Sequence, residues 1–229
     1  MPTDLPILSP FVALGYAAAV TKQIRLATGV CLVPEYNPLL LAKLAASLDF
    51  VSSGRFVFGM GIGWMKEEFG ALGIPWERRA ARSREAVEAM RRLWEDSVSS
   101  YSGEFFSFAG ARAFPKPARR IPIIMGGQTE AALRRAARYA DGWCGFNLTP
   151  DEAAEKLRLL DGYLGEKGRS RKGFEIFVSP VVALRPDSIP AYRDAGVDEL
   201  YLAPVFATPF TTVAETTKVI EDLGRKWIR

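Results

Sequence analysis

Residues 24–33 read Ile-Arg-Leu-Ala-Thr-Gly-Val-Cys-Leu-Val, a run that is apolar almost throughout. Such a run is typical of a parallel strand that is covered on both faces. Asn37 and Pro38 follow it, and these residue types favour the N-cap and the first position of a helix. The stretch therefore predicts a buried strand followed by a helix over residues 37–49.

The same alternation extends in both directions. The sequence predicts strands at 55–61, 121–125, 142–146, 174–183 and 199–203, and helices at 10–22, 77–95, 129–139, 150–167, 188–195 and 213–226. An insertion at 98–120, with Ser-Gly turns and Phe105, Phe106 and Phe108, is predicted as a hairpin and loop whose aromatic residues cover a pocket or plug the core. Six strand–helix units after one helix predict a single α/β domain over residues 1–229. Both an open doubly wound sheet and a (β/α) barrel fit, although a full barrel typically needs about 250 residues.

Composition and charge argue against several classes of partner. The 229 residues are 48% hydrophobic and 24% charged, as in a globular protein, and the net charge is only +4. Arginines in 77–95 alternate with glutamates, which indicates a solvated helix face rather than a nucleic-acid surface. No apolar run approaches the ~20 residues that span a bilayer. We therefore expect a cytoplasmic protein with neither nucleic acid nor membrane as a partner.

The chain contains no histidine, which excludes Ser-His-Asp and Cys-His triads and argues against a catalytic zinc site, so no metal is expected. Cys31 and Cys144 lie in apolar runs and are interpreted as buried small hydrophobes in a reducing compartment. The chemistry must come from carboxylates, hydroxyls, backbone amides or a bound cofactor, and the cofactor is the most attractive of these.

Several blocks, in order, carry a family resemblance over essentially the whole chain. The sequence resembles the bacterial luciferase-like family, especially its coenzyme F420-dependent oxidoreductases. The blocks are Asn37-Pro38, Leu41-Ala42-Lys43, Ser53-Gly54-Arg55-Phe56 and Gly59 to Trp64, then Glu67-Glu68-Phe69, Arg79 and Arg82, then Phe105-Phe106, Pro115-Lys116-Pro117 and Ile121-Pro122-Ile123, and finally Gly126-Gly127 and Ala140-Asp141-Gly142-Trp143.

The resemblance implies a TIM-barrel-like (β/α)8 fold that lacks its first two strands, which leaves an incomplete barrel of about six βα units with a gap between strands 24–33 and 199–203. It implies coenzyme F420 as cofactor, or alternatively FMN, and hydride transfer to or from a small organic substrate. An FMN-dependent monooxygenase and a non-catalytic flavin-binding protein are the alternatives. The family's acid/base groups come from the absent second strand, so no catalytic residue is assigned and little turnover is expected. Because unpaired strand edges recruit partners, we expect self-association at this gap and a homo-oligomer, as a dimer. The alternatives are that the N-terminal segment Met1–Ser9 closes the gap or that it stays open.

Two candidate cofactor contacts combine the resemblance with backbone chemistry. Gly126, Gly127, Gln128 and Thr129 end a strand and begin a helix, where free amides and the helix dipole favour a phosphate. Alternatively, Gly127 makes a tight turn and Thr129 caps the helix. By resemblance, Gly29-Val30 corresponds to a bulge with a non-proline cis peptide that supports the cofactor ring, and the alternative is a glycine that relieves crowding in a strand.

The Gly59-Met-Gly61-Ile-Gly63 run lacks the spacing of a dinucleotide fingerprint and is interpreted as a strand end that opens into a site. By resemblance, Gly61, Trp64 and Glu67 border the cofactor. Trp64 could instead be a core or lid aromatic, and Glu67 a first-turn residue favoured by the helix dipole. Asn147 and Leu202-Ala203-Pro204 are weaker candidates, because they lie at strand ends.

Overall fold

The structure is a computed structural model that describes residues 8–180 and 186–201 together with isolated positions between 212 and 225. Its main sheet has the order β1-β3-β6-β7-β8-β9, with β2 also paired to β3, and every pairing in it is parallel. The strands are β1 (Leu26–Ala27), β2 (Cys31–Leu32), β3 (Phe56–Gly61), β6 (Ile123–Gly126), β7 (Gly142–Leu148), β8 (Glu175–Pro180) and β9 (Glu199–Leu200).

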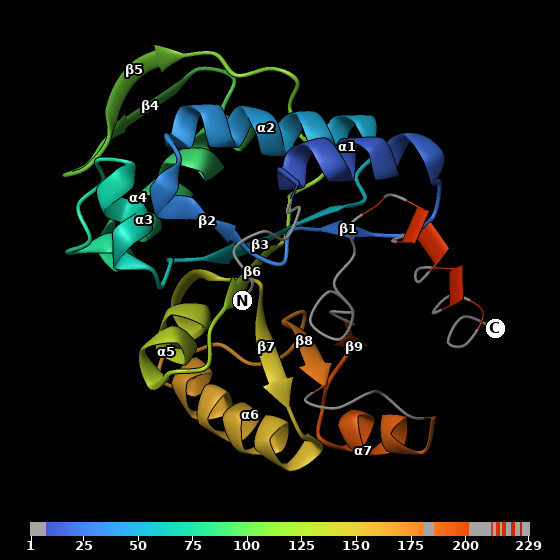
Figure 1. Cartoon of the computed structure of the whole chain (residues 1–229). Coiled ribbons are helices and arrows are strands. Elements are labelled where there is room, and N and C mark those ends of the chain that lie inside the picture. Colours follow the sequence, from blue (N-terminus) through green and yellow to red (C-terminus); the bar gives the residue numbers. More distant parts are fainter. Residues whose placement is uncertain are drawn as a thin grey trace.

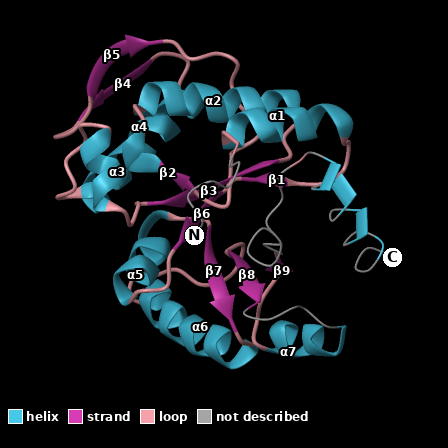
Figure 2. Ribbon diagram, viewed as in Figure 1, coloured by secondary structure: helices cyan, strands magenta, loops and turns pink. Residues whose placement is uncertain are grey.

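The sheet curls, and the helices lie on its outer side (Figures 1 and 2). They are α1 (Pro10–Val20), α2 (Pro38–Val51), α3 (Lys66–Ala71), α4 (Arg79–Glu95), α5 (Glu130–Tyr139), α6 (Pro150–Gly165) and α7 (Ile189–Asp194), with 3-10 turns η1 (Val33–Glu35) and η2 (Pro186–Ser188). β1 and β9 end the strand order and do not pair with each other among the described residues. This arrangement confirms the predicted incomplete barrel and excludes the doubly wound sheet, which would carry helices on both faces.

Alternation along the strands separates the barrel interior from the helix-facing layer. Phe56 and Phe58 are fully buried, and their rings contact Phe11 of α1 and Trp94 of α4. Val57, between them, lines an interior cavity. Because side chains alternate between the two faces of a strand, the large residues fill the helix layer and the small ones leave space inside the barrel.

Helix starts follow the predicted capping chemistry. The Asn37 side chain accepts a hydrogen bond from the Leu39 amide (2.9 Å) and Pro38 occupies the first turn, as predicted. Thr149 and Glu152 form a capping box at the start of α6. The predicted helix 77–95 starts at Arg79 instead, because Arg78 adopts a left-handed conformation with φ of 61°.

Two other boundaries differ from the prediction. The strand expected at 24–33 is split into β1 and β2, because the segment Gly29-Val30 between them departs from regular strand geometry. No range was predicted for helix α3, although Glu67 was considered as a first-turn residue, because its six residues are too few for a helical period to show. Fully buried Phe69 holds this helix in place. The ends of the predicted strands 174–183 and 199–203, and most of helix 213–226, lie outside the described residues.

The insertion forms an antiparallel hairpin of β4 (Ser99–Ser102) and β5 (Ser107–Ala111), as predicted. Buried Glu85 of α4 anchors it by accepting hydrogen bonds from the amides of Glu104 (3.0 Å), Phe105 (2.8 Å) and Phe106 (2.7 Å). Phe106 and Phe108 pack against the core, which supports the interpretation as a hydrophobic plug.

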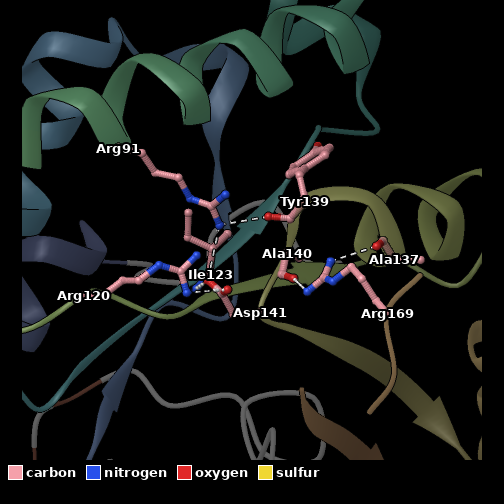
Figure 3. A network of polar contacts seen from close by, with 8 residues as sticks. All are labelled: Arg91, Arg120, Ile123, Ala137, Tyr139, Ala140, Asp141 and Arg169. Atoms are coloured by element: carbon pink, nitrogen blue, oxygen red, sulfur yellow. Dashed lines mark hydrogen bonds and ion pairs between the residues drawn. The ribbon is translucent and has the colours of Figure 1, made fainter. Parts of the chain in front are cut away.

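A polar network ties the amino ends of the central strands together (Figure 3). Asp141, just before β7, accepts hydrogen bonds from the Ile123 amide (3.0 Å), from Arg120 (2.7 Å) and from Arg91 (3.3 Å). Arg169 donates to the carbonyls that end α5, at Ala137 and Ala140. In barrels the amino-terminal face generally serves stability, so the functional site is expected at the opposite edge.

Candidate functional site

The Gly29-Val30 segment separates β1 from β2 at the carboxyl edge of the sheet. Ala27 pairs with Val57 and Cys31 with Met60, so the first strand contains one residue more than β3 over this interval. The extra residue is a bulge, and the peptide bond between Gly29 and Val30 is cis. The predicted bulge and cis bond are therefore confirmed, and they explain why a single strand over 24–33 was wrong.

The Val30 side chain fills the space that glycines leave at the ends of the next two strands. A Cβ atom built on Gly61 would lie 2.8 Å from Val30 Cγ2, and one on Gly126 would lie 3.1 Å from Val30 Cγ1. Gly126 was expected to admit a ligand, but its side-chain position faces Val30 instead. The three residues thus form one surface, with Val30 across the carboxyl ends of β3 and β6.

Thr28 fixes this bulge to β3. Its hydroxyl donates a hydrogen bond to the Gly59 carbonyl (2.7 Å), and a Cβ at Gly59 would overlap the Thr28 carbonyl oxygen. Thr28 is only 3% exposed, so this hydrogen bond is shielded from water. The glycine at 59 is required by the close approach of two backbones and not by a dinucleotide, in agreement with the sequence interpretation.

An interior cavity of about 130 Å³ opens beside the bulge. Most of the residues that line it are apolar. Its polar side chains are those of Thr28, Cys144 and Tyr201. The lining residues are Ala27, Thr28, Gly29, Val30, Val57, Gly59, Ile124, Cys144, Phe177 and Tyr201. Small residues together with the rings of Phe177 and Tyr201 line the cavity, so its wall suits a flat, mostly apolar group.

Cys144 and Tyr201 hydrogen-bond to each other on the wall of this cavity. The Cys144 thiol donates to the Tyr201 hydroxyl (3.4 Å), which donates to the Gly145 carbonyl (3.1 Å). Burial raises the pKa of the Cys144 thiol, and burial together with Cys144 raises the pKa of Tyr201 far above its usual value. Both groups are therefore neutral near pH 7. The sequence did not single out Tyr201, and it predicted Cys144 as a buried packing residue. The alternation of inward-facing side chains along β7 and β9 is the signal that could have identified both as cavity residues.

The turn into α5 forms a second, shallower depression of about 440 Å³ lined by Gly127, Gln128, Thr129, Phe146 and Lys156. Gly127 has φ of 112°, which disfavours any side chain. The Thr129 side chain caps Ala132 (3.2 Å), so the earlier amides of the first turn remain for a ligand. The cap and the tight turn are thus both present, and neither prevents anion binding.

Lys156 of α6 adds a positive charge to this depression, and the sequence analysis did not single it out. Its ammonium lies 3.8 Å from Glu155 and its side chain is 28% exposed. Gln128 donates its side-chain amide to the Phe146 carbonyl, which ties the turn to the end of β7. The Trp143 indole also donates to the Gly127 carbonyl (2.7 Å), and this hydrogen bond fixes the backbone of the turn to β7.

Trp64 and Glu67 are not brought into either depression. Trp64 is 76% exposed on the loop after β3, so its interpretation as a core aromatic is wrong. Glu67 is exposed in the first turn of α3, where the helix dipole favours a carboxylate. Asn147 is exposed in a left-handed conformation (φ 53°) at an irregularity of β7, and residues 202–204 lie outside the described residues.

Two kinds of feature are absent from the described residues. They contain no group of three or more His, Cys, Asp or Glu side chains that could hold a metal ion. No helix among them is both long and apolar enough to cross a bilayer.

The sequence pattern of the luciferase-like monooxygenase family matches residues 2–225. The chain belongs to this family. An uncharacterized protein from Mycobacterium tuberculosis is 38% identical over 223 residues, which are 96% of this chain and 76% of the relative.

Relatives with assigned activities include both a reductase and a monooxygenase. The 5,10-methylenetetrahydromethanopterin reductase of Archaeoglobus fulgidus is 33% identical, over 90% of this chain and 60% of the relative. The pyrimidine monooxygenase of Allorhizobium ampelinum is 31% identical, over 80% of this chain and 51% of the relative. The solved coenzyme F420-dependent tetrahydromethanopterin reductase from Methanopyrus kandleri superposes with a TM-score of 0.67 at 26% identity, covering 75% of this chain and 54% of that structure.

Proposed function

We propose that this luciferase-like chain binds coenzyme F420 and serves an oxidoreductase that transfers hydride between this cofactor and a small organic substrate. The observation that carries the proposal is the pairing of the Gly29-Val30 bulge with the depression at the start of α5 that Lys156 borders. The two features lie at the carboxyl edge of the sheet, where barrel enzymes build their sites.

The residues present fit a ring joined to a phosphate. Val30 and the cavity beside it offer an apolar surface for one face of the ring. The first-turn amides of α5 and the ammonium of Lys156 suit the phosphate, because a helix amino terminus and a cation both favour negative charge. Bound there, the cofactor would supply hydride chemistry, while the chain supplies orientation and exclusion of water.

Coenzyme F420 is proposed ahead of FMN because the Archaeoglobus relative is a reductase and the Methanopyrus structure is that of a coenzyme F420-dependent enzyme. The pyrimidine monooxygenase relative and the name of the family favour the second candidate, an FMN-dependent monooxygenase. Both cofactors carry a phosphate, so the site at α5 serves either. No described residue is assigned as the acid or base.

Titration of the purified chain with coenzyme F420 and with FMN, followed by cofactor fluorescence, tests the proposal. We expect saturable binding of coenzyme F420 that is weakened roughly tenfold by Lys156→Gln, since one charged contact is lost. Lys172→Gln, in an exposed turn, is the matched control and should bind as the wild type does. Tighter binding of FMN than of coenzyme F420 would favour the FMN-dependent monooxygenase. If the chain bound neither cofactor, the proposal would be wrong.

A further inference from the structure

Helices α5 and α6 lie side by side on the outside of the sheet, and a depression of about 240 Å³ opens between their carboxyl-terminal halves (Figure 1). We call it the α5–α6 depression, and it is lined by Arg134, Arg135, Arg138, Tyr163, Glu166 and Lys167. It shares no lining residue with the depression at the start of α5. Its four cations and one carboxylate give the lining a net charge of +3, whereas the whole chain carries only +4.

Carboxylates neutralise one of these four cations. The Arg134 guanidinium lies 3.0 Å from Glu130 and 2.9 Å from Glu166. The other three cations, Arg135, Arg138 and Lys167, form no ion pair and no side-chain hydrogen bond within the part of the chain that the structure describes. Three positive charges of the lining are therefore left unpaired by the described chain.

Arg135 is the least exposed of these three cations. Its side chain is half-buried, and its Nε atom is buried without a hydrogen-bond partner among the described residues. Burial lowers the pKa of the Arg135 guanidinium, and the positive charge of Arg79 also lowers it. A half-buried cation beside a second cation is costly unless an anion lies next to it. Because buried donors in proteins are nearly always hydrogen-bonded, Arg135 points to a ligand that accepts from it.

The end of helix α5 does not account for these cations. Arginines are common in the last turn of a helix, where they donate to its terminal carbonyl groups and interact with its dipole. In α5 the terminal carbonyls accept hydrogen bonds of 2.7–2.9 Å from Arg169 and Arg91, which come from outside the helix (Figure 3). Arg135 and Arg138 donate to none of these carbonyls, so another partner is required to explain them.

We propose that the α5–α6 depression binds a small molecule that carries two linked phosphate groups. A guanidinium donates two parallel hydrogen bonds to phosphate oxygens, and two of the unpaired cations are arginines. A multivalent anion also matches three cations, whereas a single carboxylate would leave two of them unpaired. The depression is smaller than the pockets of about 300–1,000 Å³ that enclose drug-sized ligands, so it suits the diphosphate group itself.

A long polyanion such as nucleic acid fits this place less well. The exposed side of α6 carries Asp151, Glu155 and Asp161, and that of α4 carries Glu88 and Glu95. These carboxylates flank the unpaired cations and would repel the phosphates of an extended chain, because nucleic-acid surfaces need an unbroken basic stripe. The charge is thus concentrated in one depression and not spread over a face.

Calorimetric titration of the full chain with inorganic pyrophosphate at low ionic strength tests the inference. We expect saturable binding that Arg135→Gln weakens about tenfold or more, because a charge-assisted contact is lost. Arg138→Gln should act in the same direction, and its exposed position leaves the fold intact. Arg135→Lys should bind with intermediate affinity, since it keeps the charge but not the planar fork. Arg158→Gln, at an exposed arginine of α6 outside the lining, is the matched control and should bind as the wild type does.

Thermal unfolding gives a second readout. Pyrophosphate should raise the unfolding temperature of the wild type but not that of Arg135→Gln, because a ligand stabilises only the state that binds it. Without pyrophosphate, Arg135→Gln should unfold at the same temperature as the wild type or higher, since the substitution removes an unpaired half-buried charge. A purely structural Arg135 would instead give a less stable variant with unchanged pyrophosphate affinity.

Four further outcomes would overturn the inference. The first is a wild type that does not bind pyrophosphate. The second is equal weakening by Arg158→Gln and Arg135→Gln, which would reveal a non-specific charge effect. The third is loss of binding in Lys156→Gln but not in Arg135→Gln, which would place the diphosphate at the start of α5. The fourth is binding of phosphatidylglycerol vesicles without binding of pyrophosphate, which would indicate a lipid contact. These titrations contain no coenzyme F420, so the inference and the proposed function fail separately.

Discussion

Arg25 and Glu199 form an ion pair of 2.6 Å across the open side of the sheet, although 174 residues separate them in the chain. Arg25 immediately precedes β1 and Glu199 begins β9, the two strands that end the strand order. The same guanidinium also contacts Glu175 at the start of β8. Side chains therefore join the amino ends of these strands where no strand pairing occurs among the described residues.

Arg25→Gln should lower the free energy of unfolding by about 1 kcal/mol. The carboxylate of Glu175, followed by that of Glu199, raises the pKa of Arg25, but the side chain is 34% exposed and solvent screens the pair. Urea unfolding measures the effect. Arg158→Gln, at an exposed position of α6, is the control and should change stability by much less. Equal effects of the two substitutions would show that the bridge adds no stability.

Gly61→Ala should destabilise the fold through Val30, because the added methyl would lie 2.8 Å from Val30 Cγ2. We expect a loss of about 1–3 kcal/mol, as for other overpacked cores. The double variant Gly61→Ala, Val30→Ala should recover part of this loss, which a double-mutant cycle of unfolding free energies measures. Strictly additive effects would mean that Val30 and Gly61 are not packed against each other.

Gly127→Val should weaken coenzyme F420 binding by a factor of about ten or more, because a branched side chain would cover the first-turn amides of α5. Gly173→Val also places valine at a positive φ, 72° against 112°, but in a turn that does not line the depression at the start of α5. It controls for general loss of stability. If both variants bind the cofactor with the same affinity as the wild type, Gly127 serves only the turn.

Glu35 should make stability depend on pH. Burial, and then the carboxylate of Glu68, raise its pKa from 4.5 to about 6. Because the folded state holds this proton more tightly, the stability that it contributes is complete below pH 4.5 and is lost as the pH rises through 6. Glu35→Gln should therefore stabilise the protein at pH 7 by at most about 1 kcal/mol, after allowance for solvent screening.

Thermal unfolding of the Glu35→Gln variant and the wild type at pH 4.5 and pH 7 checks this prediction. The stabilisation should be present at pH 7 and largely absent at pH 4.5. Glu95→Gln, at an exposed position of α4, should show no such difference between the two pH values. A stabilisation of Glu35→Gln that is independent of pH would contradict the role of the carboxylate proton.

The sequence alone determined the order of the strands and helices, because the information is local. The apolar run at 24–33, the Asn37-Pro38 start and the Thr129 cap each act within a few residues. The resemblance located Gly29-Val30 and the turn at Gly127, and it chose the incomplete barrel over the doubly wound sheet. Contacts of this kind recur at fixed positions in a family and can be read from a motif.

Only the tertiary structure showed which residues meet across the barrel. Val30 with Gly61 and Gly126, Tyr201 with Cys144, and Lys156 beside the α5 turn come from different strands and helices. Their proximity depends on the curl of the sheet and on the register of each pair of strands, which no local pattern encodes. The exposure of Trp64 is likewise settled by packing, since an apolar side chain has the same local sequence signal whether it is covered or left in water.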